Sequence, residues 1–447
     1  MPIAKVLQLG AAGNAGGTFY FVATYKWTAA SSVLAWGSIV YDPADDLVYS
    51  SAHVNTPSPY REVLLVTDLT SGDCVGSYYY NGDSGYGSAR NMHVGVNVSG
   101  QDCVVQFARY NQISPRVYNI NNFSTIPTYS TDAYLFYNTR MANAIMGHNG
   151  YPYVYGNYVR YDTPAGYVMF PYSTNNSSTN KYQSYEYAPM GWNDARLMGT
   201  DQVAVVGVTN YYNPRVMKFT LTSVDSISTY VSMQITNMGT DYANTQASPV
   251  AYRPTGNVSY IATHWGICPL NFTTMTAHAT YPTGRLMPTN VPNPWTAPTN
   301  DVYYIHVSYD PINDRIYLCK DHWAIALSPD LATIYWYITG NFAQTCVVPK
   351  GDEDGNIIFS ARSQSDITKF VIAQLDKDAS QVPTVSANPI ANVYWQRGTS
   401  GVTMTSSTVT TSYGVPSFTS TKSGSLTPLT TGSLISYPPN TKTIGPL

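Results

Sequence analysis

The residues of this chain that could do chemistry begin with its seven histidines. None forms an HxH or HExxH pattern, the spacings that bring two imidazoles to one metal ion. His53, His264-Trp265 and His322-Trp323 each fall where the second strand of a repeated unit is expected to end, which would place them on one face. Such a patch could stack on sugar rings or pack against a protein. The alternative, which we favour, is that these side chains cover strand ends inside the core.

Two loops contain catalytic or metal-binding residue types. Gly82–Ser88 (GDSGYGS) contains the GDSG of a serine-protease nucleophile loop, but no pattern for a general base accompanies it, and a glycine-rich loop is the better interpretation. Gly351–Asn356 (GDEDGN) is rich in side-chain oxygens, but a calcium loop needs roughly six to eight oxygens at fixed offsets and a distal Glu. A β-turn before a strand explains it better. The five cysteines form no CxxC pair. The sequence therefore predicts no catalytic residue, no metal and no cofactor.

The composition limits the function classes. Only 11% of the 447 residues are charged, against about 25% in ordinary soluble domains, and the net charge is −3. Nucleic-acid and membrane-surface partners are not expected, because both need a basic face. The N-terminal residues do not read as a signal peptide, and no run of about 18 apolar residues is present. The 40 tyrosines and the few charges suit permanent protein contacts or sugar binding.

The elements that must position these residues are short strands in a repeat. The phrase YDPADDLVYS (residues 41–50) returns as YDPINDRIYL (residues 309–318), and helical periodicity is nearly absent. Seven related phrases, about 52 residues apart, are Asp46–Tyr49, Asp102–Val105, Tyr151–Val154, Asp201–Ala204, Asn257–Tyr260, Asp314–Tyr317 and Gly355–Ile358. We interpret the doubled phrase as the turn between the first two strands of a unit, in which Asp-Pro starts the turn and the second Asp caps it.

A period of this length resembles that of a β-propeller. The sequence predicts an all-β protein, a seven-bladed β-propeller of four-stranded antiparallel blades with extended N- and C-terminal arms. Residues 1–35 would form an N-terminal arm plus a strand, Gly17–Tyr25, that closes the last blade. Residues 36–380 would form the propeller, and residues 381–447 a Ser/Thr-rich arm or tail able to add strands to a partner's sheet edge.

The whole chain resembles, in style and composition, a structural protein of a tailed-bacteriophage virion. The features behind this resemblance are the low charge, the Ser/Thr/Asn/Tyr/Gly-rich strands, the odd number of cysteines and the terminal arms. The resemblance implies a non-enzymatic, tail-associated virion component, whose partners are other virion structural proteins in several copies and a host-surface glycan. It implies synthesis in the host cytoplasm without a signal peptide, followed by assembly into the virion.

Two other functions stay open. The chain could be a glycan-binding or glycan-hydrolysing propeller, a lectin or glycosidase with a funnel at the axis lined by acidic or arginine residues. Against this, several expected axis-lining strands, such as Gly37–Tyr41 and Ala142–Met146, contain no carboxylate. An intracellular interaction scaffold is a third, weaker possibility, because the charge content is low for that class.

Overall fold

The fold comes from a computed structural model. It describes residues 18–27, 30, 32–55, 61–80, 92–96, 102–110, 112–119, 125–126, 129–130, 142–146, 152–160, 163–171, 180–184, 191–198, 202–208, 214–223, 226–236, 250–263, 266–274, 276–277, 285–292, 305–384, 387–390, 393–407, 410–414, 418–422, 427–428 and 434–447. Between residues 80 and 249 the description is of backbone strands alone.

The described part of the chain is all β, which confirms the predicted fold class. It consists of antiparallel strands joined by turns, and it contains no helix that could cross a membrane. Most of the sheets have five strands, an arrangement compatible with a propeller-like fold. We number the seven larger sheets 1 to 7 along the chain, by the strand that begins each sheet in space, from β2 in sheet 1 to β28 in sheet 7. The strands of each sheet are given in spatial order.

The first three sheets come from the N-terminal part of the chain. Sheet 1 contains β2 (Ser32–Asp42), β3 (Leu47–Asn55), β4 (Arg61–Asp68), β5 (Cys74–Tyr80) and β37 (Leu434–Ser436). Sheet 2 contains β6 (Met92–Val96), β7 (Asp102–Tyr110), β8 (Gln112–Asn119) and β9 (Thr125–Ile126). Sheet 3 contains β11 (Ala142–Met146), β12 (Pro152–Arg160), β13 (Thr163–Pro171), β14 (Asn180–Ser184) and β35 (Phe418–Lys422). A separate pair joins β10 (Tyr129–Ser130) to β36 (Thr427–Pro428).

The other four sheets follow the same plan. Sheet 4 contains β15 (Gly191–Met198), β16 (Gln202–Val208), β17 (Pro214–Ser223), β18 (Ser226–Thr236) and β34 (Thr410–Gly414). Sheet 5 contains β19 (Val250–Arg253), β20 (Val258–Thr263), β21 (Gly266–Asn271), β23 (Arg285–Thr289) and β33 (Thr403–Ser407), and β22 (Thr276–Ala277) pairs with β21. Sheet 6 contains β24 (Ile305–Asp310), β25 (Arg315–Lys320), β26 (Trp323–Leu327), β27 (Ile334–Gly340), β32 (Val393–Gly398) and β31 (Ala387–Ile390). Sheet 7 contains β28 (Phe342–Pro349), β29 (Ile357–Ser363), β30 (Lys369–Leu375), β1 (Phe21–Lys26) and β38 (Thr441–Pro446).

The seven repeated phrases of the sequence all mark the same place in these sheets. Each coincides with the start of the second strand of a sheet, from β3 in sheet 1 to β29 in sheet 7. The doubled phrase is the turn between β2 and β3 and the turn between β24 and β25, as predicted. The repeat in the sequence is therefore a repeat in topology.

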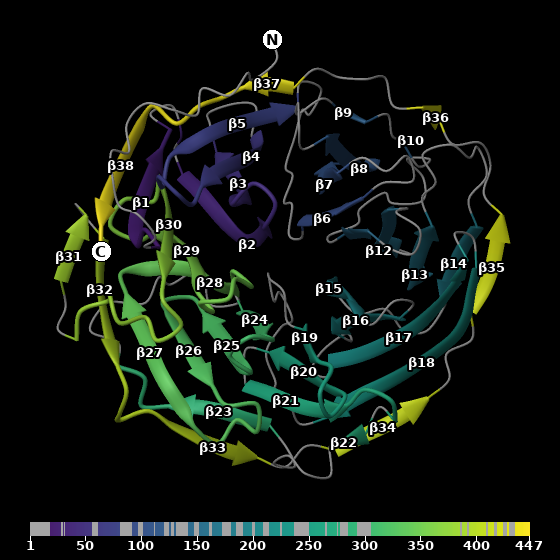
Figure 1. Cartoon of the computed structure of the whole chain (residues 1–447). Helices are drawn as coiled ribbons and strands as arrows, with labels where there is room; N and C mark the ends of the chain where they lie inside the picture. The colour runs from purple at the N-terminus through teal and green to yellow at the C-terminus, as the bar shows by residue number, and fades with distance from the viewer. Residues whose placement is uncertain are drawn as a thin grey trace.

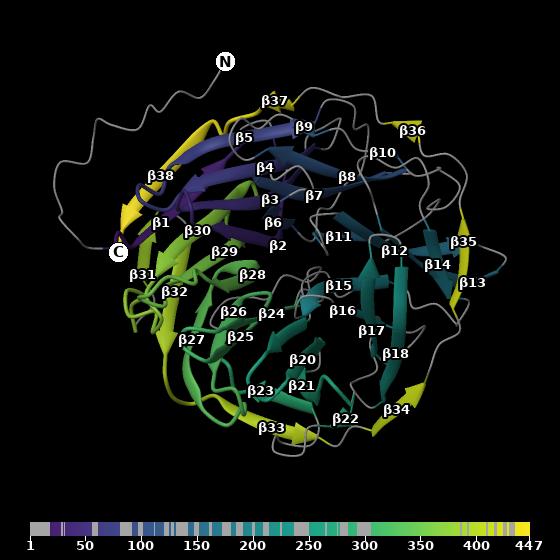
Figure 2. The same ribbon diagram turned by 45° about the vertical axis from the view of Figure 1, so that its right-hand side comes forward.

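The C-terminal strands lie along the outer rim of the molecule (Figures 1 and 2). Strands β32, β33, β34 and β35 pair with the fourth strands of sheets 6, 5, 4 and 3, β36 pairs with β10, β37 pairs with sheet 1, and β38 pairs with β1 of sheet 7. This order is the reverse of the order of the sheets in the chain. Because β31 contacts both β1 and β38, the first of these strands lies beside the last. We call β31–β38 the belt.

The belt explains why the sheets differ from the four-stranded units that the sequence predicts. In sheet 1 and in sheets 3 to 7 the fourth strand would otherwise present an unpaired edge, and a belt strand pairs with it. The sequence predicts that this Ser/Thr-rich segment could add strands to a partner's sheet, whereas here the sheets belong to its own chain. A tethered strand has a high effective concentration at its own sheet, which favours pairing within one molecule. The division of the chain at residues 35 and 380 stays a prediction.

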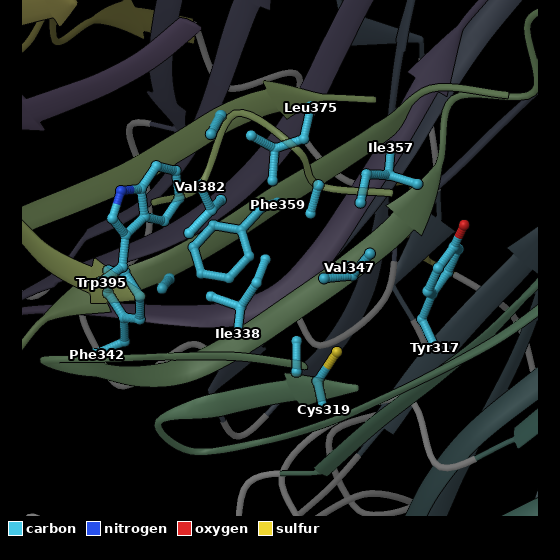
Figure 3. Close-up of a cluster of buried hydrophobic side chains, with 14 of the residues drawn as sticks. Tyr317, Cys319, Ile338, Phe342, Val347, Ile357, Phe359, Leu375, Val382 and Trp395 are labelled. Carbon is cyan, nitrogen blue, oxygen red and sulfur yellow. The ribbon is translucent and has the colours of Figure 1, made fainter. Parts of the chain in front are cut away.

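Apolar side chains fill the seams between successive sheets in the described part of the chain. One cluster lies between sheets 6 and 7, and its members include Tyr317, Ile338, Phe359 and Leu375 (Figure 3). Comparable clusters join sheet 7 to sheet 1 and sheet 5 to sheet 6. Strand β29 is buried along its whole length, on both faces. Sheets of this kind need a neighbour on each side, because either face left in water would expose apolar surface.

Sheet 7 is assembled from three separate parts of the chain. Strand β1 pairs with β30 on one side and with β38 on the other, so N-terminal and C-terminal segments lie together. Apart from Lys26, which is half-buried, every residue of β1 is buried, and the Tyr25 hydroxyl donates to the Gly72 carbonyl of sheet 1 at 2.8 Å. Strand β1 is therefore an interior strand of sheet 7 that also contacts sheet 1.

Candidate functional site

The turns at the two ends of the sheets hold the polar residues that the sequence singles out. Turns between first and second strands lie at one end, and turns between second and third strands lie at the opposite end, because neighbouring strands are antiparallel. We call these the first-turn end and the second-turn end. The predicted patch concerns the second-turn end.

At the second-turn end, His322 and Trp323 sit where β25 turns into β26. Trp323 is 8% exposed and packs in the cluster between sheets 5 and 6, and the His322 carbonyl accepts the N–H of Gly340 at 3.1 Å. Trp323 is thus a core residue at a strand end. His264 and Trp265 lie outside the described residues, as do Gly82–Ser88 and the side chain of His53. The binding patch therefore stays a prediction.

Burial governs the titration of His322. Desolvation, followed by the charge of Lys320, lowers the pKa of His322 to about 4, and its Nδ1 atom has no hydrogen-bond partner among the described residues. The folded chain therefore keeps this imidazole neutral in a range where an unfolded chain, with a His pKa near 6.5, protonates it. Stability from this group is present above about pH 6.5 and is lost as the pH falls towards 4.

A pH titration of stability tests this assignment. We expect the melting temperature of the natural chain to fall more steeply between pH 6.5 and pH 4 than that of His322→Asn. Carboxylates titrate in both proteins, so the difference between the two curves isolates the imidazole. Parallel curves over this range would show that His322 titrates alike in the folded and unfolded chains.

Backbone hydrogen bonds at the second-turn end hold neighbouring sheets together. The Asp321 carbonyl accepts from the N–H of Thr345 at 3.1 Å and from its hydroxyl at 2.5 Å, which ties sheet 6 to sheet 7. Thr345 lies in an irregular part of β28 where Gln344 takes a φ of 58°. The N–H of Val33 donates to the Ile367 carbonyl at 2.7 Å and ties sheet 1 to sheet 7 in the same way.

One buried cation lies near this end. Arg362 at the end of β29 is 7% exposed, and desolvation lowers its pKa to about 10. It stays charged at neutral pH, and its position in the strand places it on the side of sheet 7 that packs against sheet 1.

At the first-turn end, one turn geometry occurs three times. Its pattern is Tyr-x-Pro-x-x-Asp/Asn, and the last residue has a positive φ: 54° at Asp46, 55° at Asn257 and 49° at Asp314. In each turn the tyrosine hydroxyl donates to the side-chain oxygen of that last residue, at 2.9, 2.9 and 3.0 Å. Asp and Asn tolerate this left-handed conformation better than other side chains. The tyrosines, Tyr41, Tyr252 and Tyr309, were missed as turn residues, although their fixed spacing was visible.

In the two of these turns that begin Tyr-Asp-Pro, the cap is the first Asp, Asp42 or Asp310, which corrects the prediction that the second Asp caps. Asp310 is completely buried, and its carboxylate accepts from the N–H groups of Ile312 and Asn313 at 2.9 and 3.1 Å. It also accepts from the Asn313 amide at 2.6 Å and from the Tyr317 hydroxyl at 2.8 Å. The side chain of the second Asp, Asp46 or Asp314, accepts from the tyrosine hydroxyl instead.

Removal of this carboxylate should be costly. We expect Asp310→Ala to lower the free energy of unfolding by about 3 kcal/mol, because the buried Tyr317 hydroxyl and two turn N–H groups lose their acceptor. Ile312→Ala is the matched control in the same turn, since Ile312 is 51% exposed and should change stability by less than about 0.5 kcal/mol. Urea unfolding of both variants measures the difference, and equal effects would contradict the role of Asp310.

Side chains of the first-turn end also link successive sheets. Arg253 of sheet 5 makes a two-point ion pair with Asp314 of sheet 6, at 2.6 and 2.7 Å. The Asn313 amide donates to the Gly355 carbonyl before β29 at 2.8 Å, and Lys350 of sheet 7 lies 2.9 Å from Asp46 of sheet 1. These contacts place the turns of sheets 5, 6, 7 and 1 on one side of the molecule.

The charges of this end are engaged in structural contacts. The hydrogen bond from Arg253 is the largest cause that lowers the pKa of Asp314, and desolvation, with Asp314 next, raises the pKa of Tyr309 to about 12. In Gly351–Asn356, Asp352 accepts from the N–H and the amide of Asn356 at 2.8 Å each, so the loop is a capped turn as predicted. The described residues include no group of three metal-ligating side chains.

The fold and these ends define the chain as an all-β protein of antiparallel sheets, an arrangement compatible with a propeller-like fold, with structural turn networks at both ends. No family model matches the sequence, and no curated protein matches it.

Proposed function

We propose that the chain is a seven-bladed β-propeller that serves as a non-enzymatic structural component of a phage virion, tail-associated, with the propeller as a rigid disc for assembly or host-surface binding. The seven sheets would be the blades. Support for closure comes from the first strands, since β2 contacts β6, β6 contacts β11, β11 contacts β15, β15 contacts β19, β19 contacts β24, β24 contacts β28 and β28 contacts β2.

The observation that carries the structural role is the belt. About sixty residues add an outer strand to one sheet after another, and the side chains of β33 and β38 are mostly exposed. A segment used in this way stiffens the rim and covers the sheet edges. Outer strands of this kind suit a rigid protein that must keep its shape under mechanical force and in contact with neighbouring subunits.

The use of the described carboxylates agrees with a non-enzymatic role. Asp42, Asp68, Asp310, Asp330, Asp366 and Asp376 accept backbone N–H groups in turns, and Asp46 and Asp314 pair with cations of a neighbouring sheet. A glycosidase needs two carboxyl groups that face each other across a substrate, about 5 to 10 Å apart. Carboxylates held in turn caps serve the fold instead.

Two measurements test the proposal. An antibody against the recombinant chain should label particles purified from the virus that encodes it, and the full chain should not hydrolyse the members of a glycan array. Absence from the particles would overturn the virion role. Turnover of a glycan would establish the enzymatic alternative, whereas tight binding without turnover would identify a lectin and favour host attachment over assembly.

A further inference from the structure

Strand β38 is the outer strand of sheet 7, and within that sheet it pairs with β1. Its side chains from Thr441 to Thr443 are exposed, and its attachment to β1 is a ladder of six opposed residue pairs. Main-chain ladders of this kind are the same in any copy of a protein, so they do not distinguish a chain's own strand from that of a neighbour.

A few side chains give the strand its specificity. Ile444 packs into the seam between sheets 7 and 1, and Leu447 packs against the seam between sheets 6 and 7 while its N–H donates to the Tyr20 carbonyl at 3.0 Å. Lys442 lies 2.6 Å from Asp73, but both side chains are nearly half exposed, so the ion pair is worth less than about 1 kcal/mol. All these contacts lie within seven residues and can be made by the same segment of another copy.

The acceptor, by contrast, must always be covered. Strand β1 is almost entirely buried, and its outer edge carries the N–H and C=O groups that β38 pairs. Exposure of this edge would leave a template for other strands. Which strand covers it depends on the balance between the effective concentration of the tethered strand, roughly millimolar, and the local concentration of neighbouring copies in an assembly.

The connection into β38 permits it to leave alone. The chain passes from β37 on sheet 1 to β38 on sheet 7 through Pro438 and Pro439, whose rings favour an extended path. Tyr437 is fixed before this point, since its carbonyl accepts from Trp27 Nε1 at 3.0 Å and from the Ser77 hydroxyl at 2.7 Å. The rest of the belt can therefore stay docked while the last seven residues move.

We infer that the β1 edge of sheet 7 is a strand-acceptor site for Thr441–Leu447 of a second copy of this chain, so that neighbouring subunits are linked by exchange of β38. This inference rests on the proposed function and specifies how a multi-copy assembly would be locked. The exchange conserves every contact of the strand and adds a covalently connected crossing between two subunits, a low-cost route to association.

Cysteine pairs in the full-length chain test the exchange. Thr24 and Thr443 lie opposite each other in the β1–β38 ladder, and opposed residues of antiparallel strands are about 4.5 to 5.5 Å apart between Cα atoms, within disulfide range. The double variant Thr24→Cys/Thr443→Cys should close a disulfide within one chain. A concentrated mixture of the two single variants, oxidised with glutathione disulfide, should give a covalent dimer that neither single variant gives alone.

A matched pair elsewhere on the belt provides the control. Thr289 and Thr403 face each other in the β23–β33 ladder, with hydroxyl oxygens 2.9 Å apart. Strand β33 is flanked by β32 and β34, both docked, so it cannot exchange alone, and mixed Thr289→Cys and Thr403→Cys chains should stay monomeric.

The outcomes separate cleanly. The exchange is overturned if the mixture of Thr24→Cys and Thr443→Cys gives no more covalent dimer than the control mixture while the double variant forms its disulfide within one chain. It is also overturned if the double variant does not form that disulfide. Neither result bears on the labelling of virus particles, so a failure of the exchange is distinguishable from a failure of the virion role.

Discussion

Replacement of Trp395 by alanine should lower the free energy of unfolding by about 3 to 5 kcal/mol, a large part of the stability of a typical domain. Trp395 belongs to β32 of the belt and is completely buried. Its ring lies 6.1 Å from Phe342 and 5.8 Å from Phe359 between centroids, with both rings edge-on to it (Figure 3). Removal of the indole would leave a cavity lined by aromatic rings, and the belt would lose its anchor between sheets 6 and 7.

The neighbouring residue is the control for this variant. Tyr394 is 40% exposed, and its contact with Asn341 runs through backbone groups that alanine retains. Tyr394→Ala should therefore change the unfolding free energy by less than about 1 kcal/mol. Urea unfolding measures the stability of both variants. In limited proteolysis of Trp395→Ala, the first cleavage should fall in the belt. A Trp395→Ala chain as stable as Tyr394→Ala would mean that the belt is not anchored through the indole.

Deletion of residues 1–26 should have a still larger effect, above about 5 kcal/mol, and abolish a single cooperative transition. The deletion removes the interior strand of sheet 7, so that β30 and β38 both lose their partner and the buried Phe21 and Tyr25 leave the seam with sheet 1. Thermal melting by circular dichroism, together with solution size, measures the result. The proposed ring of blades would then be open at the seam between sheets 7 and 1.

A point variant distinguishes the effect of losing strand β1 from the effect of losing only the charge of Lys26. Lys26→Gln keeps the backbone of β1 and removes only the ion pair with Asp366, at 3.0 Å, whose lysine is 36% exposed. This pair is worth at most about 1 kcal/mol, so the variant should melt like the natural chain. If the deletion also melts like the natural chain, β1 does not close the proposed ring of blades.

Local sequence was sufficient for the strands and the first turns. The phrases around Asp46 and Asp314 predicted where second strands begin, because the left-handed residue, the proline and the alternating apolar residues are all within ten positions. The same reasoning assigned the capping role to the wrong aspartate. Asp310 caps because it is buried beneath its own turn, and burial was not visible in the local pattern.

The predicted patch shows the opposite limit. His322 and Trp323 lie where β25 turns into β26, but the sequence alone does not distinguish a binding face from a core seam for these two residues. Their roles separate only when sheet 5 is set against sheet 6, since Trp323 is then covered. Arg362 carried no local signal at all, because its low exposure depends on the packing of sheet 7 against sheet 1.

Composition and short-range pattern alone determined that this chain is all β, built from a repeated unit with the same turn after each first strand, and poor in charge. The tertiary structure decided which sheets the Ser/Thr-rich C-terminal residues pair with, which aspartates cap turns and which strand covers β1. The physical reason is the range of the forces involved. Turn and strand preferences act over a few residues, whereas the pairing of an edge with a strand several hundred residues away depends on closing a long loop, which no local pattern encodes.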